Sequence, residues 1–295
     1  TQVNAGAGDN TVTVGAANDG AHDDAITTGA GDDRFLLTSV QLSANLTISA
    51  GAGSDVLEIT TDATVLDGAL AGISGVETLK LVAAAADGAQ GVLLGANAAA
   101  AGLTTLDASG MGASDALVLD ATAFAAALAI TSGGGDDVML LGTGGSVVNA
   151  GDGHNHITVG AANDGVDDDD ITTGVGTDEI LVDATRLTAH LTVNGGGGSD
   201  TLLVGGDAAI VDADLAGISN VEVLMLEGNA VDNAQSVTVG VNAIAAGIRT
   251  VDLSALTAGD AVTLDASAFN AGLTVKLHAG VDNITLGDGD DVLLG

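Results

Sequence analysis

Cysteine and proline are absent from this 295-residue sequence, and aromatic residues nearly so. Without cysteine, the chain has neither disulfides nor thiolate metal sites. Without proline, ladders of paired strands can run without interruption. Aromatic residues make up 1% of the chain, and all are phenylalanine: Phe35, Phe124 and Phe269. No apolar run reaches membrane-spanning length, so we expect no insertion into a membrane.

Basic residues are also scarce: there are 5 Lys+Arg against 40 Asp+Glu, a formal net charge of −35. A chain without a basic patch or aromatic stacking platform is not expected to bind nucleic acid. Hydrophobic residues nevertheless make up 46%, which excludes a disordered acidic tail. The basic residues are too few to offset the self-repulsion of the folded chain: Arg34, Lys80, Arg186, Arg249 and Lys276. Carboxylates and backbone carbonyls are hard oxygen ligands, so the composition favours calcium as the compensating ion.

The sequence repeats itself without gaps. The segment from Val3 to Phe35 is matched by the segment from Val148 to Ile180, 145 positions later, and the match continues to the end of the chain. Self-similarity at a fixed period is typical of solenoids and arrays. We therefore predict one continuous solenoid with repeat units at 1–145 and 146–290, and the start of a further unit at 291–295.

Glycine and aspartate recur in a nonapeptide, G-G-x-G-x-D-x-U-x, where U is a large aliphatic residue. Six copies are close to this pattern and have aspartate in the sixth position: Asp33, Asp55, Asp137, Asp178, Asp200 and Asp291. A further copy retains Asp282 but has His278 in place of the second glycine. Weaker copies have Asn10, Asn155 or Ser146 in the aspartate position, and Ser146 is interpreted as a lost site.

Several copies are in tandem at nine-residue intervals, as from Asp137 to Ser146, Asn155 and Asp164. An insertion of five residues then leads to Asp169, and the first unit has the same arrangement at Asp19 and Asp24. Glycine permits the left-handed backbone of a tight turn, and its carbonyls can face an ion. The x-U-x triplet predicts a short strand with one side chain inward. Two turns and two strands would complete one coil of a parallel β-helix.

Between the nonapeptides lie short segments rich in Val, Leu, Ile and Thr, such as 76–82, 103–109 and 116–124. Turns rich in Ala, Gly and Asp separate them. These segments predict further strands. The alanine-rich patches at 98–101 and 124–128 are expected to form short helical turns.

The Gly/Asp nonapeptides resemble the RTX, or haemolysin-type, calcium-binding repeats of secreted bacterial proteins. The resemblance implies an all-β parallel β-roll in which turn aspartates and backbone carbonyls hold calcium between neighbouring coils. The implied ligands are Asp33, Asp55, Asp137, Asp178, Asp200, Asp282 and Asp291, with Asp19, Asp24, Asp164 and Asp169 beside the insertions. The segments ISGVETLKL (73–81) and LDATAF (119–124) are similar to strand-rich modules of RTX-type surface-layer proteins and large adhesins. That likeness implies type I secretion and a cell-surface location.

Plainer interpretations stand beside these. The turn aspartates could serve ordinary turn chemistry, and the acidic run Asp167–Asp170 could be a solvated turn rather than a cation site. Asp107, Asp120, Asp252 and Asp265 follow strands and are expected to cap turns. His154-Asn155-His156 is expected to be a surface turn rather than a zinc site, which needs at least three converging ligands.

No catalytic motif is found: the sequence has no H-E-x-x-H, no G-x-S-x-G and no cysteine nucleophile. We expect a non-enzymatic, calcium-stabilised segment of a surface-layer or extracellular assembly protein. It would associate with itself in a lattice or filament, and other regions would contact cell-surface polysaccharide. The alternatives are the stalk of an RTX adhesin, with ice binding as a variant, and the calcium-binding tail of an RTX exoenzyme.

Overall fold

The computed structural model describes residues 1–15, 24–61, 64–82, 88–160, 169–206, 209–228 and 234–295. Among the predicted calcium ligands, Asp19 and Asp164 lie outside the described residues, as do Asp167 and Asp168 of the acidic run. The chain divides into two compact units, Thr1–Asp152 and Gly153–Gly295, and each is described by itself.

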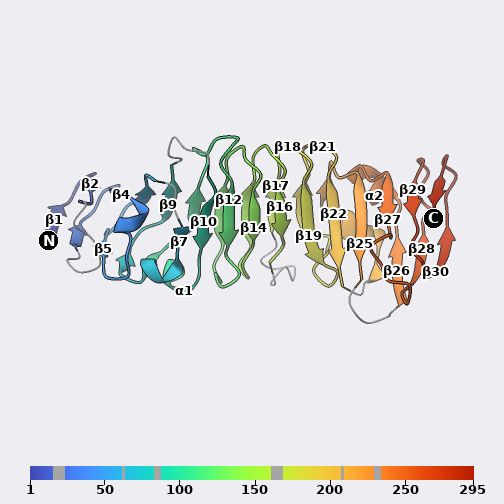
Figure 1. Cartoon of the computed structure of the whole chain (residues 1–295), viewed down its shortest axis with the longest axis horizontal. Coiled ribbons are helices and arrows are strands. Elements are labelled where there is room, and N and C mark those ends of the chain that lie inside the picture. The colour runs from blue at the N-terminus through green and yellow to red at the C-terminus, as the bar shows by residue number, and fades with distance from the viewer. Residues whose placement is uncertain (16–23, 62–63, 83–87, 161–168, 207–208, 229–233) are drawn as a thin grey trace. The chain divides into compact units, whose positions relative to one another are not determined.

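The first unit is built from three parallel sheets whose strands interleave along the chain (Figure 1). One contains β1 (Gln2–Gly6), β3 (Ala25–Thr28), β5 (Thr47–Ser49) and β8 (Ile73–Ser74). The second contains β2 (Thr11–Thr13), β4 (Arg34–Leu37), β6 (Val56–Ile59), β9 (Thr78–Leu81), β11 (Thr105–Asp107), β13 (Leu128–Thr131) and β15 (Ser146–Asn149). The third contains β7 (Thr64–Val65), β10 (Gln90–Leu93), β12 (Leu117–Asp120) and β14 (Val138–Leu140).

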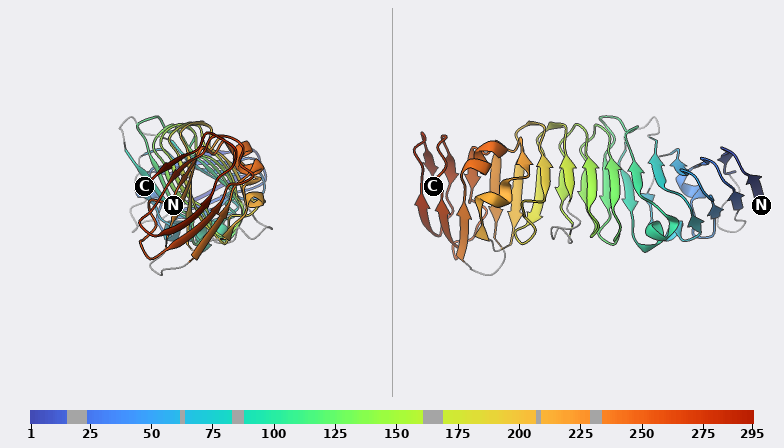
Figure 2. Two further views of the ribbon diagram at one scale, coloured as in Figure 1. Left: turned by 90° about the vertical axis from the view of Figure 1, so that its right-hand side faces the viewer. Right: turned by 180° about the vertical axis from the view of Figure 1, so that it is seen from behind.

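The second unit repeats this plan, and its strands can be seen side by side in the right-hand view of Figure 2. Its longest series of strands is β16 (His156–Thr158), β19 (Glu179–Asp183), β22 (Thr201–Gly205), β25 (Val223–Glu227), β27 (Thr250–Asp252), β29 (Thr274–Lys276) and β31 (Val292–Leu294). A second series is β17 (Asp170–Thr172), β20 (Thr192–Asn194) and β24 (Ile218–Ser219). A third is β23 (Ala209–Ile210), β26 (Ala234–Thr238), β28 (Ala261–Asp265) and β30 (Val281–Thr285), and β18 (Val175–Gly176) pairs with β21 (Gly197–Gly198).

Strand pairing confirms the predicted fold class: both units are all-β, parallel β-solenoids. Strand β4 pairs in parallel with β6, and β6 with β9, each partner lying one coil further along the chain. The strands after the nonapeptides begin directly behind the aspartates, as β4 does behind Asp33 and β22 behind Asp200. The predicted coil of two nonapeptides occurs where Leu128 pairs with Ser146, 18 positions later. Other coils are longer, since Phe35 pairs with Leu57 and Leu79 with Leu106.

Inward side chains form a stacked column in each unit. In the first unit, paired positions one coil apart are aliphatic or aromatic and at most 2% exposed: Phe35, Leu57, Leu79, Leu106, Ile130 and Val148. The corresponding column of the second unit contains Ile157, Ile180, Leu202, Leu224, Val251 and Val275, each 0% exposed. Alternation of inward and outward residues along each strand produces this narrow core.

Two short α-helices interrupt the coils, α1 (Ala96–Ala101) and α2 (Val241–Ala246), and each faces a 3₁₀ turn of the preceding coil, η2 (Asp67–Leu70) or η3 (Asp212–Leu215). A third 3₁₀ turn, η1, spans Ser39–Gln41. The helical prediction at 98–101 is confirmed, but the one at 124–128 is wrong. That segment is an irregular turn leading into β13, and Phe124 is buried at 1% exposure. Burial of the Phe124 ring stabilises the turn more than the helical preference of the alanines would stabilise a helix.

Candidate functional site

The glycine-rich turns of successive coils stack backbone against backbone. A Cβ on Gly51 would lie 1.9 Å from the carbonyl oxygen of Gly29, and Gly51 has φ +104°. In the second unit, a Cβ on Gly198 would lie 1.6 Å from the carbonyl oxygen of Gly176. Only glycine fits at such positions. The turns therefore bring the carbonyl groups of one coil directly against the next coil.

Carboxylates link these stacked turns in the first unit. The backbone N–H of Asn10 donates to Asp33 Oδ1 at 2.8 Å, and the Asn10 side-chain amide donates to the same oxygen at 2.9 Å. The N–H of Asp33 donates to Asp55 Oδ1 at 2.7 Å. The N–H of Asp55 donates to Glu77 Oε2 at 2.8 Å. Each acid thus accepts a hydrogen bond from the preceding coil. We call this series, Asn10, Asp33, Asp55 and Glu77, the first ladder.

The second unit contains the same arrangement. The backbone and side-chain amides of Asn155 donate to Asp178 Oδ1 at 2.8 and 3.0 Å. The N–H of Asp178 donates to Asp200 Oδ1 at 2.9 Å, and that of Asp200 to Glu222 Oε2 at 2.9 Å. These four residues form the second ladder. Two ladders related by the sequence repeat therefore place Asp33 and Asp55 together in one unit, and Asp178 and Asp200 together in the other.

The other oxygen of each aspartate is buried without compensation. Asp33, Asp55, Asp178 and Asp200 are at most 1% exposed. Among the described residues, the Oδ2 atom of each has no hydrogen-bond partner. Burial of an unpartnered polar atom costs about 1–3 kcal/mol, and more when the group is charged. The ladders are therefore incomplete as a set of protein–protein contacts.

Burial acts to raise the pKa of Asp33, but hydrogen bonds to its carboxylate outweigh burial and leave that pKa lowered. At the next aspartate of the first ladder and at Asp200 of the second, the electrostatics oppose ionisation. Burial raises the pKa of Asp200, the hydrogen bond from Asp178 opposes this, and the charges of Asp178 and Glu222 add to it, so that the pKa lies at about 6. Burial also raises the pKa of Asp55, aided by the charges of Asp33 and Glu77. A bound cation would reverse both effects, because it stabilises the charged carboxylate.

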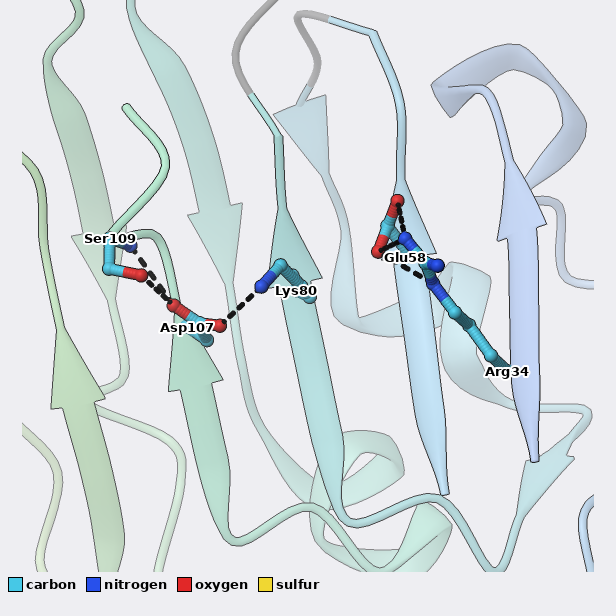
Figure 3. A network of polar contacts seen from close by, with 5 residues as sticks. All are labelled: Arg34, Glu58, Lys80, Asp107 and Ser109. Atoms are coloured by element: carbon cyan, nitrogen blue, oxygen red, sulfur yellow. Dashed lines mark hydrogen bonds and ion pairs between the residues drawn. The ribbon is translucent and has the colours of Figure 1, made fainter. Parts of the chain in front are cut away.

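Basic side chains of the first unit pair with acids outside its ladder, as Figure 3 shows. Arg34 on β4 contacts Glu58 on β6 at 2.6 Å, and Lys80 on β9 contacts Asp107 on β11 at 2.9 Å. In the second unit, Lys276 pairs with Asp252 at 2.8 Å. Three of the five basic residues are thus committed to acids other than those of the ladders.

The remaining predicted ligands lie at other turns. Asp24 contacts the N-terminal amino group at 2.9 Å, and this hydrogen bond lowers its pKa. Asp137 is 0% exposed, accepts the N–H of Leu117 at 2.6 Å, and has its pKa raised to about 7 by burial.

Asp169, 2% exposed, accepts the N–H of Gly160 at 3.2 Å. Asp291 accepts the N–H of Leu273 at 2.9 Å. Asp282 lies within strand β30 and contacts His278 at 2.7 Å.

The expected turn caps are confirmed. Asp107, Asp120, Asp252 and Asp265 each accept the backbone N–H of the residue two positions later through Oδ1. The histidine turn is partly buried rather than wholly on the surface: Asn155 is 2% exposed, and His156 pairs with Glu179 at 2.9 Å. Neither histidine joins a group of three potential ligands within the described residues.

The sequence interpretation missed the glutamates that end the ladders. Glu77 follows Asp55 by 22 positions, the same interval that separates Asp33 from Asp55, and Glu222 follows Asp200 likewise. This interval is the length of one coil and could have identified them. The sequence interpretation also missed an outer row of carboxylates in the first unit. There Asp9 Oδ1 accepts the N–H of Asp32 at 2.9 Å, and Asp32 Oδ1 accepts the N–H of Ser54 at 2.8 Å.

The donor set suits a hard cation that accepts carbonyl ligands. In the described part of the chain, no three His, Asp or Glu side chains form a metal-binding group. Calcium does not require such a group, because it readily takes backbone carbonyls beside one or two carboxylates. The turns supply both kinds of oxygen, and the buried Oδ2 atoms lack other partners among the described residues.

Comparisons of the chain with protein families, curated proteins and solved structures found no match. None of the helices within the described ranges has the length and apolar character needed to cross a membrane. The class that the fold defines is the parallel β-solenoid with glycine-rich turns, and the ladders are the feature from which a function must be argued.

Proposed function

We propose that this chain is a calcium-stabilised structural segment of a secreted bacterial surface-layer or extracellular assembly protein. One observation carries the proposal: the sequence repeat places the same buried, incompletely hydrogen-bonded carboxylates in both units. A net charge of −35 adds a general repulsion that divalent ions would relieve. The recurrence of the arrangement fits a building unit that is repeated along a chain.

Calcium would be held between coils by the aspartates Asp33, Asp55, Asp178 and Asp200 together with carbonyl oxygens of the glycine turns. Its charge would neutralise the ladders and complete the coordination of the Oδ2 atoms. Because binding requires turns that exist only in the folded chain, the binding free energy would add to the free energy of folding. Folding would then follow arrival in calcium-rich surroundings outside the cell.

Self-association in a lattice or filament belongs to the same proposal, and the role assigned to the ladders is structural rather than catalytic. Their Oδ1 atoms are already engaged by backbone N–H groups, which fix the carboxylates in place. Electron microscopy of the assembled protein, with calcium and after chelation, tests this part. Ordered assemblies that persist unchanged after chelation would contradict it.

Circular dichroism with and without a chelator tests the calcium requirement. We expect the strand signal to develop with calcium and to collapse on its removal, while magnesium at the same concentration restores little of it. Magnesium demands stricter octahedral geometry and keeps more of its water. A metal-free protein with as much strand as the calcium-loaded protein would refute the proposal.

A further inference from the structure

One sheet of the first unit is apolar on its outward side as well as its inward side. The inward residues of β10, β12 and β14 are at most 3% exposed. The outward residues Leu93, Val118 and Val138, one on each strand, are 38%, 43% and 39% exposed. Parallel strands that are apolar on both sides are typical of sheets that are covered on both sides. The exposure of these side chains shows that the described part of the first unit leaves the outward side open.

The outward side chains form two rows across consecutive coils, and Figure 1 shows their strands side by side. In one row Val118 pairs with Val138. In the other, Leu93 pairs with Asp120, and Asp120 pairs with Leu140. The residue before η2 extends the second row, because β7 pairs with β10 in the same register, and this residue is 53% exposed. We call the following residues the apolar face: Leu66, Leu93, Val118, Val138 and Leu140.

The sequence repeat does not conserve the apolar face. At the positions that match Leu93, Val118, Val138 and Leu140, 145 residues later, the second unit has polar residues: Thr238, Thr263, Asn283 and Thr285. The strands of the second unit still pair in parallel, and their inward residues are still buried, as at Val237. Folding of the coils therefore does not require outward apolar residues, and those of the first unit need another explanation.

Charge restricts what can cover the apolar face. Asp120 is the one ionisable residue in the two rows, and its Oδ1 accepts the N–H and the hydroxyl of Thr122 at 3.0 and 2.7 Å. A second copy of the chain has the same net charge of −35, so two copies repel each other where acidic turns meet. The repulsion is smallest where their apolar faces meet.

We propose that the apolar face binds the apolar face of a second copy of this chain. The inference rests on the proposed function, because it assigns the self-association to one surface. The rows of both copies have the spacing of one coil, about 4.8 Å, so side chains of one sheet fit between those of the other. A contact between identical faces closes about a twofold axis and forms a dimer. Five aliphatic side chains cover less than the roughly 800 Å² per partner of a standard interface, so the contact should be weak and reversible.

Sedimentation equilibrium of the full chain in millimolar calcium tests the proposal. Between about 10 μM and about 1 mM protein, the wild type should pass from monomer towards dimer, as expected of a weak contact. Dimerisation should strengthen as sodium chloride rises from about 0.05 M to about 0.5 M, because salt screens the repulsion between the copies. A dimer that salt weakens would be held by ionic contacts, and this result would overturn the proposal.

Substitutions taken from the second unit test which face is used. The double variant Val118→Thr, Val138→Asn should weaken dimerisation by at least about tenfold. It should fold, because the second unit has these residues at the same positions. Val147→Thr removes a valine that is 60% exposed on β15, in a different sheet, and should leave dimerisation unchanged. Dimerisation of the double variant as strong as that of the wild type would overturn the proposal.

The reverse change gives the second unit an apolar face. The double variant Thr263→Val, Asn283→Val should form oligomers larger than the dimer, because each chain then has two such faces. Association no greater than that of the wild type would count against the proposal.

The dimer and the calcium requirement of the fold fail separately. A wild type that remains monomeric at about 1 mM would overturn the dimer, and binding to neutral phosphatidylcholine vesicles would then assign the apolar face to a lipid surface. Neither result affects the gain of strand signal with calcium. A strand signal that does not depend on calcium would refute the proposed function even if the dimer forms.

Discussion

The turn aspartates combine a satisfied oxygen with an unsatisfied one. Asp55 and Asp200 each hold a backbone N–H of the previous coil on Oδ1, while Oδ2 is buried without a hydrogen-bond partner among the described residues. A proton or a cation can neutralise such a group, and the two compete for the same oxygen. Acid and calcium should therefore have related effects on the folded state.

The pH dependence of the metal-free protein follows from the raised pKa values of Asp137, about 7, and Asp200, about 6. Between these values and the ordinary aspartate range, the folded protein holds protons that the unfolded chain releases. The free energy of unfolding should therefore fall as the pH rises from about 4 to about 7, by up to about 1.4 kcal/mol per pH unit for each group, and level off above that range. Urea unfolding in calcium-depleted buffers measures this slope.

The variant Asp137→Asn keeps an oxygen for the Leu117 N–H but cannot ionise. It should leave stability at about pH 4 nearly unchanged and raise it at about pH 7 in the absence of calcium. A metal-free wild-type protein that gains stability across this pH range would show that burial does not control these groups.

Glycine positions within one turn provide a matched pair of substitutions. A Cβ at Gly198 would lie 1.6 Å from the Gly176 carbonyl oxygen, at φ +144°, whereas a Cβ at Gly197 has no atom within 4 Å. Gly198→Ala should destabilise the protein by about 3 kcal/mol or more, as steric clash and strain combine. Gly197→Ala should stay within about 0.5 kcal/mol of the wild type. Thermal unfolding in calcium compares them, and equal effects would mean that the turns do not stack as described.

At the scale of elements, the short helices depend on the preceding coil. The N-cap of α1 is Gly95, which has no side chain to cap the helix. Asp67 of η2 takes over this role: Oδ1 accepts the N–H groups of Gly95 and Ala98 at 2.8 and 2.9 Å. Asp212 caps α2 through Gly240 and Ala243 in the same way. Burial acts to raise the pKa of Asp67, but hydrogen bonds from Ala98, Asn97 and Gly95 outweigh it and leave the pKa lowered.

Removal of this cap by Asp67→Ala should cost about 1–3 kcal/mol, because several buried N–H groups lose their acceptor. Asp67→Asn retains one acceptor oxygen and should cost less. Hydrogen exchange at 96–103 reports the local effect and should be unaffected by calcium. Unchanged exchange in the alanine variant would mean that the helix is held by packing alone.

The strands that follow a local sequence pattern could be predicted from the sequence. The roles of residues that depend on contacts between coils could not. The strands behind Asp33, Asp55 and Asp200 follow from the x-U-x triplet. The roles of Glu77 and Asp67 depend on which residue lies one coil away, and coil length varies with inserted helices and loops. The segment 124–128 has helical composition, yet burial of Phe124 holds it in a turn.

At the scale of the whole molecule, the sequence repeat conserves the ladders but not the residues beside them. The outer row of the first unit contains Asp9 and Asp32. At the matching positions the second unit has His154, whose Nδ1 accepts the N–H of Thr177 at 3.0 Å. In this row the first unit has two carboxylates where the second has an imidazole and a hydroxyl. Beside it the order is reversed, because Arg34 of the first unit matches Glu179 of the second.

This difference predicts unequal calcium demand. Without calcium, repulsion should weaken the first unit more, so that exchange in β4 and β6 is about tenfold faster than in β19 and β22. With calcium, the outer carboxylates Asp9 and Asp32 should strengthen binding of the ion by the first unit, and the difference in exchange between the units should narrow or reverse. Low ionic strength should enlarge the difference in metal-free exchange between the units. The outer carboxylates are exposed, and salt screens the repulsion between them.

Substitutions that give each unit the outer residue of the other test whether the outer carboxylates cause the difference in calcium demand. Asp32→Thr gives the first unit the residue of the second, and should slow metal-free exchange in β4 and β6 while lowering the calcium affinity of that unit. Thr177→Asp makes the reverse change and should produce the reverse result in β19 and β22. Asp32→Thr also removes the acceptor of the Ser54 N–H, so Asp32→Asn, which keeps an acceptor oxygen but has no charge, serves as the control that separates charge from the hydrogen bond. If both leave the contrast between the units unaltered, the outer carboxylates do not set calcium demand, and the difference must arise from the ladders themselves.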